Sequence, residues 1–530
     1  MPVNRADAAA LNRRSFLKNA AALAGAACAA RNGFAFAASA ARPTRLTQVI
    51  ADLNHIHKWD DSNGDTWDPF WADDGDLYAF NCDGRGFGPK KHGRNLAFNK
   101  LVPDASVDAS DALAGSQVNS MDEYGASSKK GPDGATWKAC GQECIDSVFY
   151  AFVSRNTYGD ESGDKLMRQT AVNSSLIKST GRGLTWTRSA DENYAQPMWP
   201  GPAFGAPFFV HYGQNGSSVT RDAADRFVYA SSTNGFWNDG DSYILGRVER
   251  GKLSALRSAD WSYYTGGDGA SDASWSRQIA DAQPILTSLA HCGQGPICFI
   301  PALGLYLLVA WYNTATMTKW FEPNRMQYDF YQAEHPWGRW ELVSSFDDSF
   351  ISAGHMYGPS LCARFQQQTG AEVRMTMFTA GCPFEDVPRG LYKMWEIPIL
   401  LRTQPVPAWL TIPGDDPRVV FSGRWHGGDE RMPALGPHTR YSRDAGSAAE
   451  LGFQGTGVAF VTEKGSQFGS VDVLLDGQQL ASVDLRTKNF PRISSVEVFA
   501  ATDLPLGPHR LRIVSKGHGT VAVESLRVVE

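Results

Sequence analysis

The sequence predicts an all-β protein made of two domains, a β-propeller followed by a jelly-roll β-sandwich. Strand-length runs of apolar and aromatic residues recur along the chain and are separated by Gly, Asp, Asn and Pro. Glycine is abundant, with 52 residues, and aromatic residues make up 12% of the chain. Long stretches with helical periodicity are hard to find. This combination favours many short strands joined by tight turns, and 530 residues are too many for one ordinary core.

The first 40 residues are predicted to be an export signal. Residues 12–18 spell Asn-Arg-Arg-Ser-Phe-Leu-Lys, a short run of small apolar residues follows, and Ala-Ser-Ala occupies 38–40. A charged start, an apolar middle and a small-residue cleavage site are typical of a signal peptide. The paired arginines indicate the twin-arginine route, a mature chain starting near Ala41 and a periplasmic or extracellular location. The apolar run is too short to span a bilayer, so we expect no stable membrane insertion.

Residues 42–404 are predicted to form the propeller. Their most hydrophobic strand-length runs lie several tens of residues apart, which suits sheets arranged radially as blades. These runs include residues 76–80, 148–153, 226–230, 305–310 and 373–378. The segment from Ser179 to Trp186 resembles the Asp-box of sialidase-type propellers, with Gly181 in place of the Asp. This box is a hairpin turn whose Trp packs between sheets, so it predicts architecture and not sialidase activity.

After a Pro-rich linker at 405–417, residues 418–530 are predicted to form a β-sandwich. Alternating strands and hairpin turns over roughly a hundred residues are typical of that architecture. Two motifs, Phe-x-Gly-Thr-Gly at 453–457 and Leu-x-x-Gly-x-His at 504–509, resemble those of galactose-binding-like jelly rolls. The resemblance implies a carbohydrate-binding module of the kind appended to secreted carbohydrate-active enzymes.

The propeller region also resembles a glycoside hydrolase family, formerly of unknown function, that includes endo-D-arabinofuranases. The resemblance covers most of residues 55–400 and implies a five-bladed propeller that cleaves a polysaccharide. It departs from the family pattern at Asn81-Cys82 and at the Cys-bearing segment 139–144. The motifs that carry it are Gly-Asp-Thr-Trp at 64–67, Phe-Trp-Ala-Asp-Asp-Gly-Asp-Leu-Tyr at 70–78, Asp-Gly-Arg-Gly-Phe-Gly at 83–88, Tyr-Ile-Leu-Gly-Arg-Val at 243–248, Pro-Trp-Gly-Arg-Trp at 336–340 and Tyr-Gly-Pro-Ser at 357–360.

Carboxylates interleaved with aromatic residues concentrate in the first predicted blade. Glycoside hydrolysis needs this mixture, because two carboxylates must flank the bond while aromatic faces stack on the sugar. Turn capping is the alternative role for any single Asp. Candidate acids and bases in the first blade are Asp65, Asp73 and Asp83. A partner carboxylate is expected from another blade, with Asp239 or Asp241 preferred to Glu322.

Six further side chains are predicted to contact the sugar. They comprise stacking tryptophans, one basic residue able to attract an acidic sugar, and two histidines able to hydrogen-bond hydroxyl groups. A buried, hydrogen-bonded structural role is the alternative for each histidine. The candidates are Trp67, Trp71, Trp237, Arg85, His291 and His355.

Other classes of site and partner are disfavoured. The formal net charge is -6, which argues against nucleic acid as a partner. Serine-esterase, nucleotide-phosphate and haem motifs are absent from the sequence. No cofactor is expected, although Asp61, Asn63 and Asp65 have the oxygen spacing of a structural calcium loop. The close pairs Cys140/Cys144 and Cys292/Cys298 suggest local disulfides in an oxidising compartment.

The sequence therefore predicts a secreted glycoside hydrolase with a carboxylate acid/base pair. Its expected partner is a polysaccharide or oligosaccharide, and the family resemblance points to a furanose-rich cell-wall glycan such as D-arabinan. Two alternatives stay open. One is a non-catalytic carbohydrate-binding protein, which the same aromatic residues would serve. The other is a polysaccharide lyase that uses His and Tyr with Arg or calcium.

Overall fold

We describe the protein from a computed structural model. The predicted signal segment and the first few residues after it lie outside the described residues. The structure describes residues 45–90, 93–102, 114–157, 169–188, 197–217, 226–238, 240–267, 273–313, 326–348, 356–381, 392–403, 409–427, 438–487, 492–502 and 504–529.

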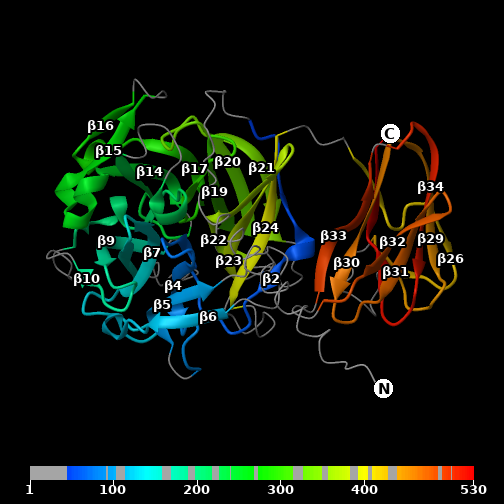
Figure 1. The fold of residues 1–530 in the computed structure, drawn as a ribbon, viewed down its shortest axis with the longest axis horizontal. Helices are drawn as coiled ribbons and strands as arrows, with labels where there is room; N and C mark the ends of the chain where they lie inside the picture. Colours follow the sequence, from blue (N-terminus) through cyan, green and yellow to red (C-terminus); the bar gives the residue numbers. More distant parts are fainter. Residues whose placement is uncertain are drawn as a thin grey trace, which may run out of the picture. The chain divides into compact units, whose positions relative to one another are not determined.

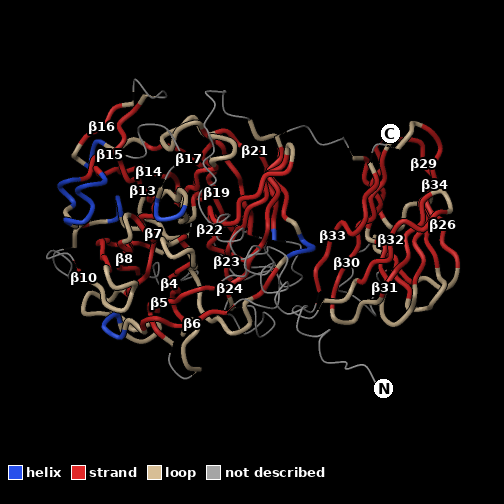
Figure 2. The backbone as a smooth tube through the Cα atoms, viewed as in Figure 1, coloured by secondary structure: helices blue, strands red, loops and turns tan. Residues whose placement is uncertain are grey.

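The described chain is nearly all β, as predicted, and Figure 2 shows strands throughout with a few short helical turns. All helices of the described ranges are 3₁₀ turns, which suits a sequence without long helical periodicity. They are η1 (Leu53–His55), η2 (Asp122–Tyr124), η3 (Pro202–Phe204), η4 (Gln214–Gly216), η5 (Arg250–Ala255), η6 (Ser258–Asp260) and η7 (Ile279–Asp281).

Residues 48–402 form five antiparallel sheets in chain order, the arrangement expected of propeller blades (Figure 1). The first sheet contains β3 (Phe70–Trp71), β4 (Leu77–Gly84), β5 (Arg94–Val102) and β6 (Ala114–Asn119). The second contains β7 (Thr136–Ile145), β8 (Val148–Thr157), β9 (Thr170–Ser179), β10 (Thr187–Arg188) and β11 (Trp199–Pro200). The third contains β12 (Pro207–Phe209), β13 (Phe227–Thr233), β14 (Gly240–Glu249), β15 (Trp261–Gly266), β16 (Ser274–Ser276) and β17 (Pro284–Cys292).

The two remaining sheets complete the series. The fourth contains β18 (Ile297–Ile300), β19 (Leu305–Asn313), β20 (Met326–Ala333) and β21 (Glu341–Asp347). The fifth contains β22 (Met356–Thr369), β23 (Glu372–Gly381) and β24 (Met394–Arg402), joined by β1 (Gln48–Ala51) and β2 (His57–Lys58). Because β1 pairs with β24, the first strand of the described chain completes the last sheet. Sheets that close on each other in this way leave few free edges.

The first strands of the sheets lie side by side around the centre of the propeller. β7 contacts both β3 and β12, and β22 contacts both β3 and β18. A parallel bridge joins His211, just after β12 of the third sheet, to Cys298 in β18 of the fourth sheet. This bridge completes the ring of neighbouring inner strands. Aromatic and aliphatic side chains fill the space between neighbouring sheets. The propeller therefore brings residues that are distant in the sequence to one central axis.

The Asp-box prediction is confirmed as a structural device. Residues 179–187 form the turn between β9 and β10, in which Ser179 Oγ accepts hydrogen bonds from the backbone N–H groups of Gly181 and Gly183. Gly183 adopts φ of 83°, which favours glycine. The Trp186 ring packs on Phe80 and Phe98 of the first sheet, as the motif implies.

The C-terminal region is a β-sandwich, as predicted. One sheet contains β25 (Leu410–Pro413), β36 (Ser525–Val529), β30 (Gly457–Gly465) and β33 (Arg492–Ala501). The second contains β26 (Val419–Ser422), β29 (Ala448–Gly455), β34 (Gly507–Ser515), β31 (Ser470–Leu475) and β32 (Gln478–Asp484). A small third sheet contains β27 (His426–Gly427), β28 (Arg440–Ser442) and β35 (Val521–Val523). The sandwich begins earlier than predicted, because β25 lies within the segment predicted as a linker, 405–417, and pairs with β36.

The predicted local disulfides are wrong. The six cysteines within the described ranges are all buried and free. Cys140 and Cys144 lie on the same strand, β7, where four residues of extended chain separate their Cα atoms by on the order of 12 Å. A disulfide requires Cα atoms less than about 7 Å apart. Cys292 ends β17 of the third sheet, whereas Cys298 lies in β18 of the fourth.

Candidate functional site

Asp65 lies just before β3, beside the axis, in a constrained backbone segment. It forms two backbone hydrogen bonds with Cys82, of 2.9 and 2.7 Å, which hold it against β4. Its neighbours Gly64 and Thr66 adopt φ of 122° and 53°. For Thr66, a non-glycine residue, such a φ costs on the order of 1–3 kcal/mol, and positions of this kind cluster at functional sites. The backbone thus holds Asp65 in one defined position.

The carboxylate of Asp65 is buried and hydrogen-bonded. Its Oδ2 accepts a hydrogen bond of 2.6 Å from the Tyr357 hydroxyl, and its Oδ1 accepts one of 3.2 Å from Thr66. Burial raises the pKa of Asp65 to about 6, with nearby Asp83 adding to the rise and Lys138 opposing it. A carboxyl group with this pKa can hold and release a proton near neutral pH.

Asp83 and Lys138 form an ion pair beside Asp65. The Lys138 side chain is 5% exposed and that of Asp83 is 17% exposed, so the pair is mostly shielded from water. Asp83 adopts φ of 48°, a second constrained position in the same short region. Its carbonyl oxygen accepts a hydrogen bond of 3.2 Å from the Tyr392 hydroxyl. Its second carboxylate oxygen, Oδ1, is buried without a hydrogen-bond partner among the described residues, so it can accept one from a ligand.

Trp311 of the fourth sheet and Gln294, in the segment between β17 and β18, extend this site. The Trp311 and Tyr357 rings lie 6.2 Å apart, and the Trp311 Nε1–H donates to the Gln294 carbonyl and to its side-chain Oε1 at 2.8 and 3.2 Å. The indole can only donate, which fixes the orientation of the Gln294 amide. The Gln294 Nε2 is buried and unpaired within the described ranges. We call Asp65, Asp83, Lys138, Tyr357 and Gln294 the Asp65 site.

A second polar cluster, the His211 cluster, lies on the axis and is more deeply buried. The His211 Nδ1 lies 2.8 Å from Glu143, and its Nε2 lies 2.9 Å from Asp68. Asp68 also accepts hydrogen bonds from Ser360 Oγ and from the Gln142 backbone N–H. The cluster joins residues of four sheet regions, and each of these side chains is buried.

The His211 imidazole carries a positive charge in this cluster. Burial by itself lowers its pKa, but the two carboxylates outweigh that effect and raise it to about 10. Burial raises the pKa of Glu143, against the opposing effect of His211. Two ring nitrogens that each face a carboxylate require two N–H groups, so we assign the imidazolium form. The His211 cluster is enclosed by protein and holds the inner strands together.

Asp73 lies at the opposite end of the inner strands from the Asp65 site. Its carboxylate pairs with Arg182 at 2.9 Å, and its backbone carbonyl accepts a hydrogen bond from Gln214. Asp73 adjoins Cys144. Lys138 of the Asp65 site lies six residues earlier in β7, a separation on the order of 20 Å. Burial raises the pKa of Asp73, but the hydrogen bond and charge of Arg182 produce a net decrease.

Of the predicted partner carboxylates, only Asp241 lies within the described residues. Asp241 is half-buried, and its Oδ1 accepts a hydrogen bond of 2.9 Å from the Ala290 backbone N–H. The predicted sugar-binding residue His291, which follows Ala290 in the chain, stacks on Tyr312 with ring centroids 3.6 Å apart. Asp239, Glu322 and His355 lie outside the described residues.

Most of the predicted stacking residues are buried. Trp67 is 1% exposed, contacts Phe87 and donates to the Gly64 carbonyl, so its faces are covered. Trp237 is 4% exposed and belongs to the core between the second and third sheets. Trp71 is half-buried. Arg85 donates hydrogen bonds to the carbonyl oxygens of Gly88, in its own loop, and of Asp61, in the segment before β3.

Two of the three residues predicted to bind calcium have side-chain oxygens engaged by the protein. The Asn63 side-chain oxygen accepts a hydrogen bond from the Arg85 backbone N–H, and the Asp65 carboxylate accepts from Tyr357. Among the described residues, no group of three or more His, Cys, Asp or Glu side chains is arranged to hold a metal ion.

Sequence reasoning missed His211, Glu143, Lys138, Tyr357 and Gln294 as site residues. A usable signal was present in β7, where Lys138 and Glu143 interrupt a strand that is otherwise suited to burial. Charged residues are rarely fully buried unless they are paired, so these two positions indicated partners elsewhere in the fold. His211 likewise follows the apolar strand β12.

The chain is similar to a curated protein over part of its length. No family model matches the chain. A curated protein from Flavonifractor plautii, described as an A type blood α-D-galactosamine galactosaminidase, is 28% identical over 102 residues. That match covers 19% of this chain and 9% of the relative, so the chain spans about a tenth of the length of that protein.

The similar solved structures are distant. An exo-β-1,3-galactanase from Phanerochaete chrysosporium is 12% identical, with 91% of this chain and 100% of that chain covered and a TM-score of 0.35. A GH32 β-fructofuranosidase from Bombyx mori is 11% identical, with 90% and 93% covered and a TM-score of 0.38. A family two carbohydrate esterase from Cellvibrio japonicus is 22% identical over 23% of this chain and 34% of its own, with a TM-score of 0.19.

The described part of the chain holds no helix with the length and apolar character needed to cross a membrane.

Proposed function

We propose that this protein is a glycoside hydrolase whose reaction takes place at the Asp65 site. The observation that carries the proposal is the Asp65 carboxyl, which is buried, held by constrained backbone and given a pKa of about 6 beside an ion-paired Asp83. Two carboxyl groups in different electrostatic environments can act as acid and base in one reaction.

Asp65 is the general acid in this mechanism. When protonated, it donates its proton to the glycosidic oxygen as the bond to the sugar breaks. The Tyr357 hydroxyl and the backbone pairing with Cys82 fix the direction from which the proton is delivered. Burial favours the neutral form of Asp65, which keeps it protonated at mildly acidic pH.

Asp83 is the negatively charged partner, because it is paired with Lys138. It either attacks the anomeric carbon or activates a water molecule, and its unpaired Oδ1 is the oxygen available for this step. Reading the first-formed anomer of the product by NMR decides between the two, since attack by Asp83 retains the configuration and activation of water inverts it.

The substrate we propose is a furanose-rich cell-wall polysaccharide such as D-arabinan, reached after twin-arginine export. The support for both is in the sequence: the ordered motifs between residues 64 and 360 for the substrate class, and residues 12–18 for export. The first of these motifs, Gly-Asp-Thr-Trp, contains Asp65, and the last, Tyr-Gly-Pro-Ser, contains Tyr357. These two side chains form a hydrogen bond with each other.

The test is release of oligosaccharides from a panel of plant and bacterial polysaccharides that includes mycobacterial arabinogalactan. We expect the mature protein to release products from at least one polymer. Asp65→Asn and Asp83→Asn should each lower the rate by about a thousandfold or more while keeping the fold, because each removes one half of the acid/base pair. Asp73→Asn, in the same sheet region but at the opposite end, is the matched control and should stay within about twofold of wild type.

Three outcomes would count against the proposal. Equal losses in Asp65→Asn and Asp73→Asn would mean that the Asp65 site is not where the reaction occurs. Binding to a polymer without release of products would favour the carbohydrate-binding alternative. Products that absorb as unsaturated uronates would instead identify a lyase.

A further inference from the structure

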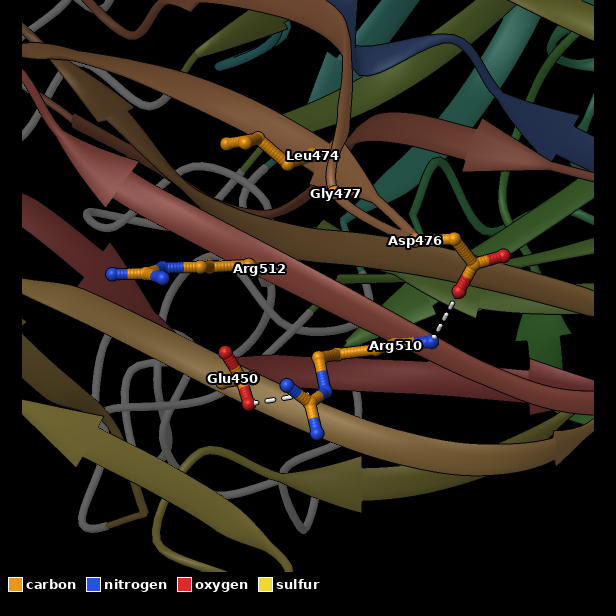
Figure 3. Close-up of a pocket in the computed structure, with 6 residues that line it drawn as sticks. All are labelled: Glu450, Leu474, Asp476, Gly477, Arg510 and Arg512. Carbon is orange, nitrogen blue, oxygen red and sulfur yellow. Dashed lines mark hydrogen bonds and ion pairs between the residues drawn. The ribbon is translucent and has the colours of Figure 1, made fainter.

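The sandwich carries a hollow of about 500 Å³ on its five-stranded sheet (Figure 3). Side chains from three neighbouring strands, β29, β34 and β31, and from the hairpin after β31 surround it. The residues that line it are Glu450, Leu474, Asp476, Gly477, Arg510 and Arg512. None of them belongs to the Asp65 site.

The outward face of this sheet presents a continuous row of side chains across all five strands. In the strand register, Val420 pairs with Glu450, Glu450 with Arg512, Arg512 with Leu474 and Leu474 with Gln479. With neighbouring strands about 4.8 Å apart, the row is roughly 19 Å long. Apolar side chains flank the polar centre, and Val420 is 64% exposed. A row of this length suits an extended chain of several sugar units.

Among the described residues, the charges around the hollow pair off and leave one cation, Arg512. Arg510 binds Glu450 at 3.3 Å, although Glu450 stands directly opposite Arg512 in the register. Asp476 accepts hydrogen bonds from His509 and from the Arg510 backbone N–H. Arg512 extends away from Glu450 and Arg510 in Figure 3 and has no hydrogen-bonding or ionic partner among the described residues. Its guanidinium is therefore available to an anion.

We propose that this sheet face binds an acidic oligosaccharide through the carboxylate of a uronic acid unit. The guanidinium of Arg512 forms two parallel hydrogen bonds with the planar carboxylate, a geometry that a neutral sugar cannot supply. The apolar face of the sugar ring packs on Leu474, and Glu450 accepts hydrogen bonds from its hydroxyl groups. This binding site acts independently of the hydrolysis proposed for the propeller.

Isothermal titration calorimetry of the full mature chain with tetragalacturonate tests this proposal, with the methyl-esterified tetramer as the neutral comparator. We expect the acidic tetramer to bind at least about tenfold more tightly than its ester, because only the free carboxylate pairs with Arg512. Arg512→Ala should remove that preference. Arg527→Ala, which removes the same charge from the opposite sheet of the sandwich, is the matched control and should keep it.

A second variant separates loss of the site from loss of the fold. Leu474→Glu places a negative charge beside Arg512 on the outward face and should abolish binding of the acidic tetramer, while its melting temperature stays close to that of wild type. Equal affinity for the acid and its ester, equal losses in Arg512→Ala and Arg527→Ala, or the absence of binding by wild type at millimolar tetramer would each overturn the proposal. All of these readouts are independent of whether the propeller hydrolyses any polymer.

Discussion

The two ends of the inner strands carry similar residues in different surroundings. At one end, Asp83 pairs with Lys138, whose side chain is 5% exposed. At the other end, Asp73 pairs with Arg182, whose side chain is 45% exposed. The pKa of Asp65, beside the first pair, is raised by burial to about 6, whereas that of Asp73 is lowered. The comparison teaches that burial, and not residue type, distinguishes a carboxyl group able to exchange a proton from a surface ion pair.

The largest difference we expect between the two ends is in the free energy of unfolding lost when the cation, Lys138 or Arg182, is removed. Lys138→Met leaves Asp83 as a largely buried charge without a partner, and we expect a loss of about 3 kcal/mol in the free energy of unfolding. Arg182→Met breaks a water-exposed pair and should cost less than about 1 kcal/mol. Urea unfolding of both variants measures the difference. Equal costs would mean that the two ends are equally exposed to water in solution.

The His211 cluster, which lies on the same inner strands, predicts a specific dependence of stability on pH. The pKa of His211 is raised to about 10 in the folded protein, from 6.5 in the unfolded chain. This contribution to stability is complete below pH 6.5 and is lost as pH rises towards 10. Between pH 7 and 9 the free energy of unfolding should fall by at most about 1.4 kcal/mol per pH unit.

The control for this dependence is His211→Gln, which cannot titrate. It should be less stable than wild type at pH 7 and should show a smaller decline towards pH 9, measured by urea unfolding at each pH. Parallel declines in the two proteins would mean that other groups account for the pH dependence and that His211 is neutral at pH 7.

The dependence of hydrolysis on pH sharpens the assignment of Asp65 over Asp73. If Asp65 donates a proton, kcat/KM should fall as pH rises through about 6, by about tenfold per pH unit. The pKa of Asp73 is lowered, so a reaction that depended on that group would show its pH dependence at lower values. A profile that is flat between pH 5 and 8 would remove Asp65 from the role of general acid.

Several local features could be predicted from the sequence because short-range rules decide them. The strands, the turns between them and the Asp-box from Ser179 to Trp186 depend on alternation, on glycine and on residues that are close in the chain. Asp65 and Asp83 were among the candidates because carboxylates and aromatic residues concentrate near them. The all-β architecture followed from the same patterns.

The tertiary structure alone decided which candidates meet. Asp65 and Asp73 are eight residues apart, yet an extended inner strand carries them to opposite ends of the propeller, while Tyr357 reaches Asp65 from the last sheet. Burial of Trp67 and the pairing of Lys138 with Asp83 likewise depend on contacts between sheets. Composition and periodicity describe each strand by itself. The pKa of a carboxyl group depends on the water and charges around it, and those are set only when distant strands come together.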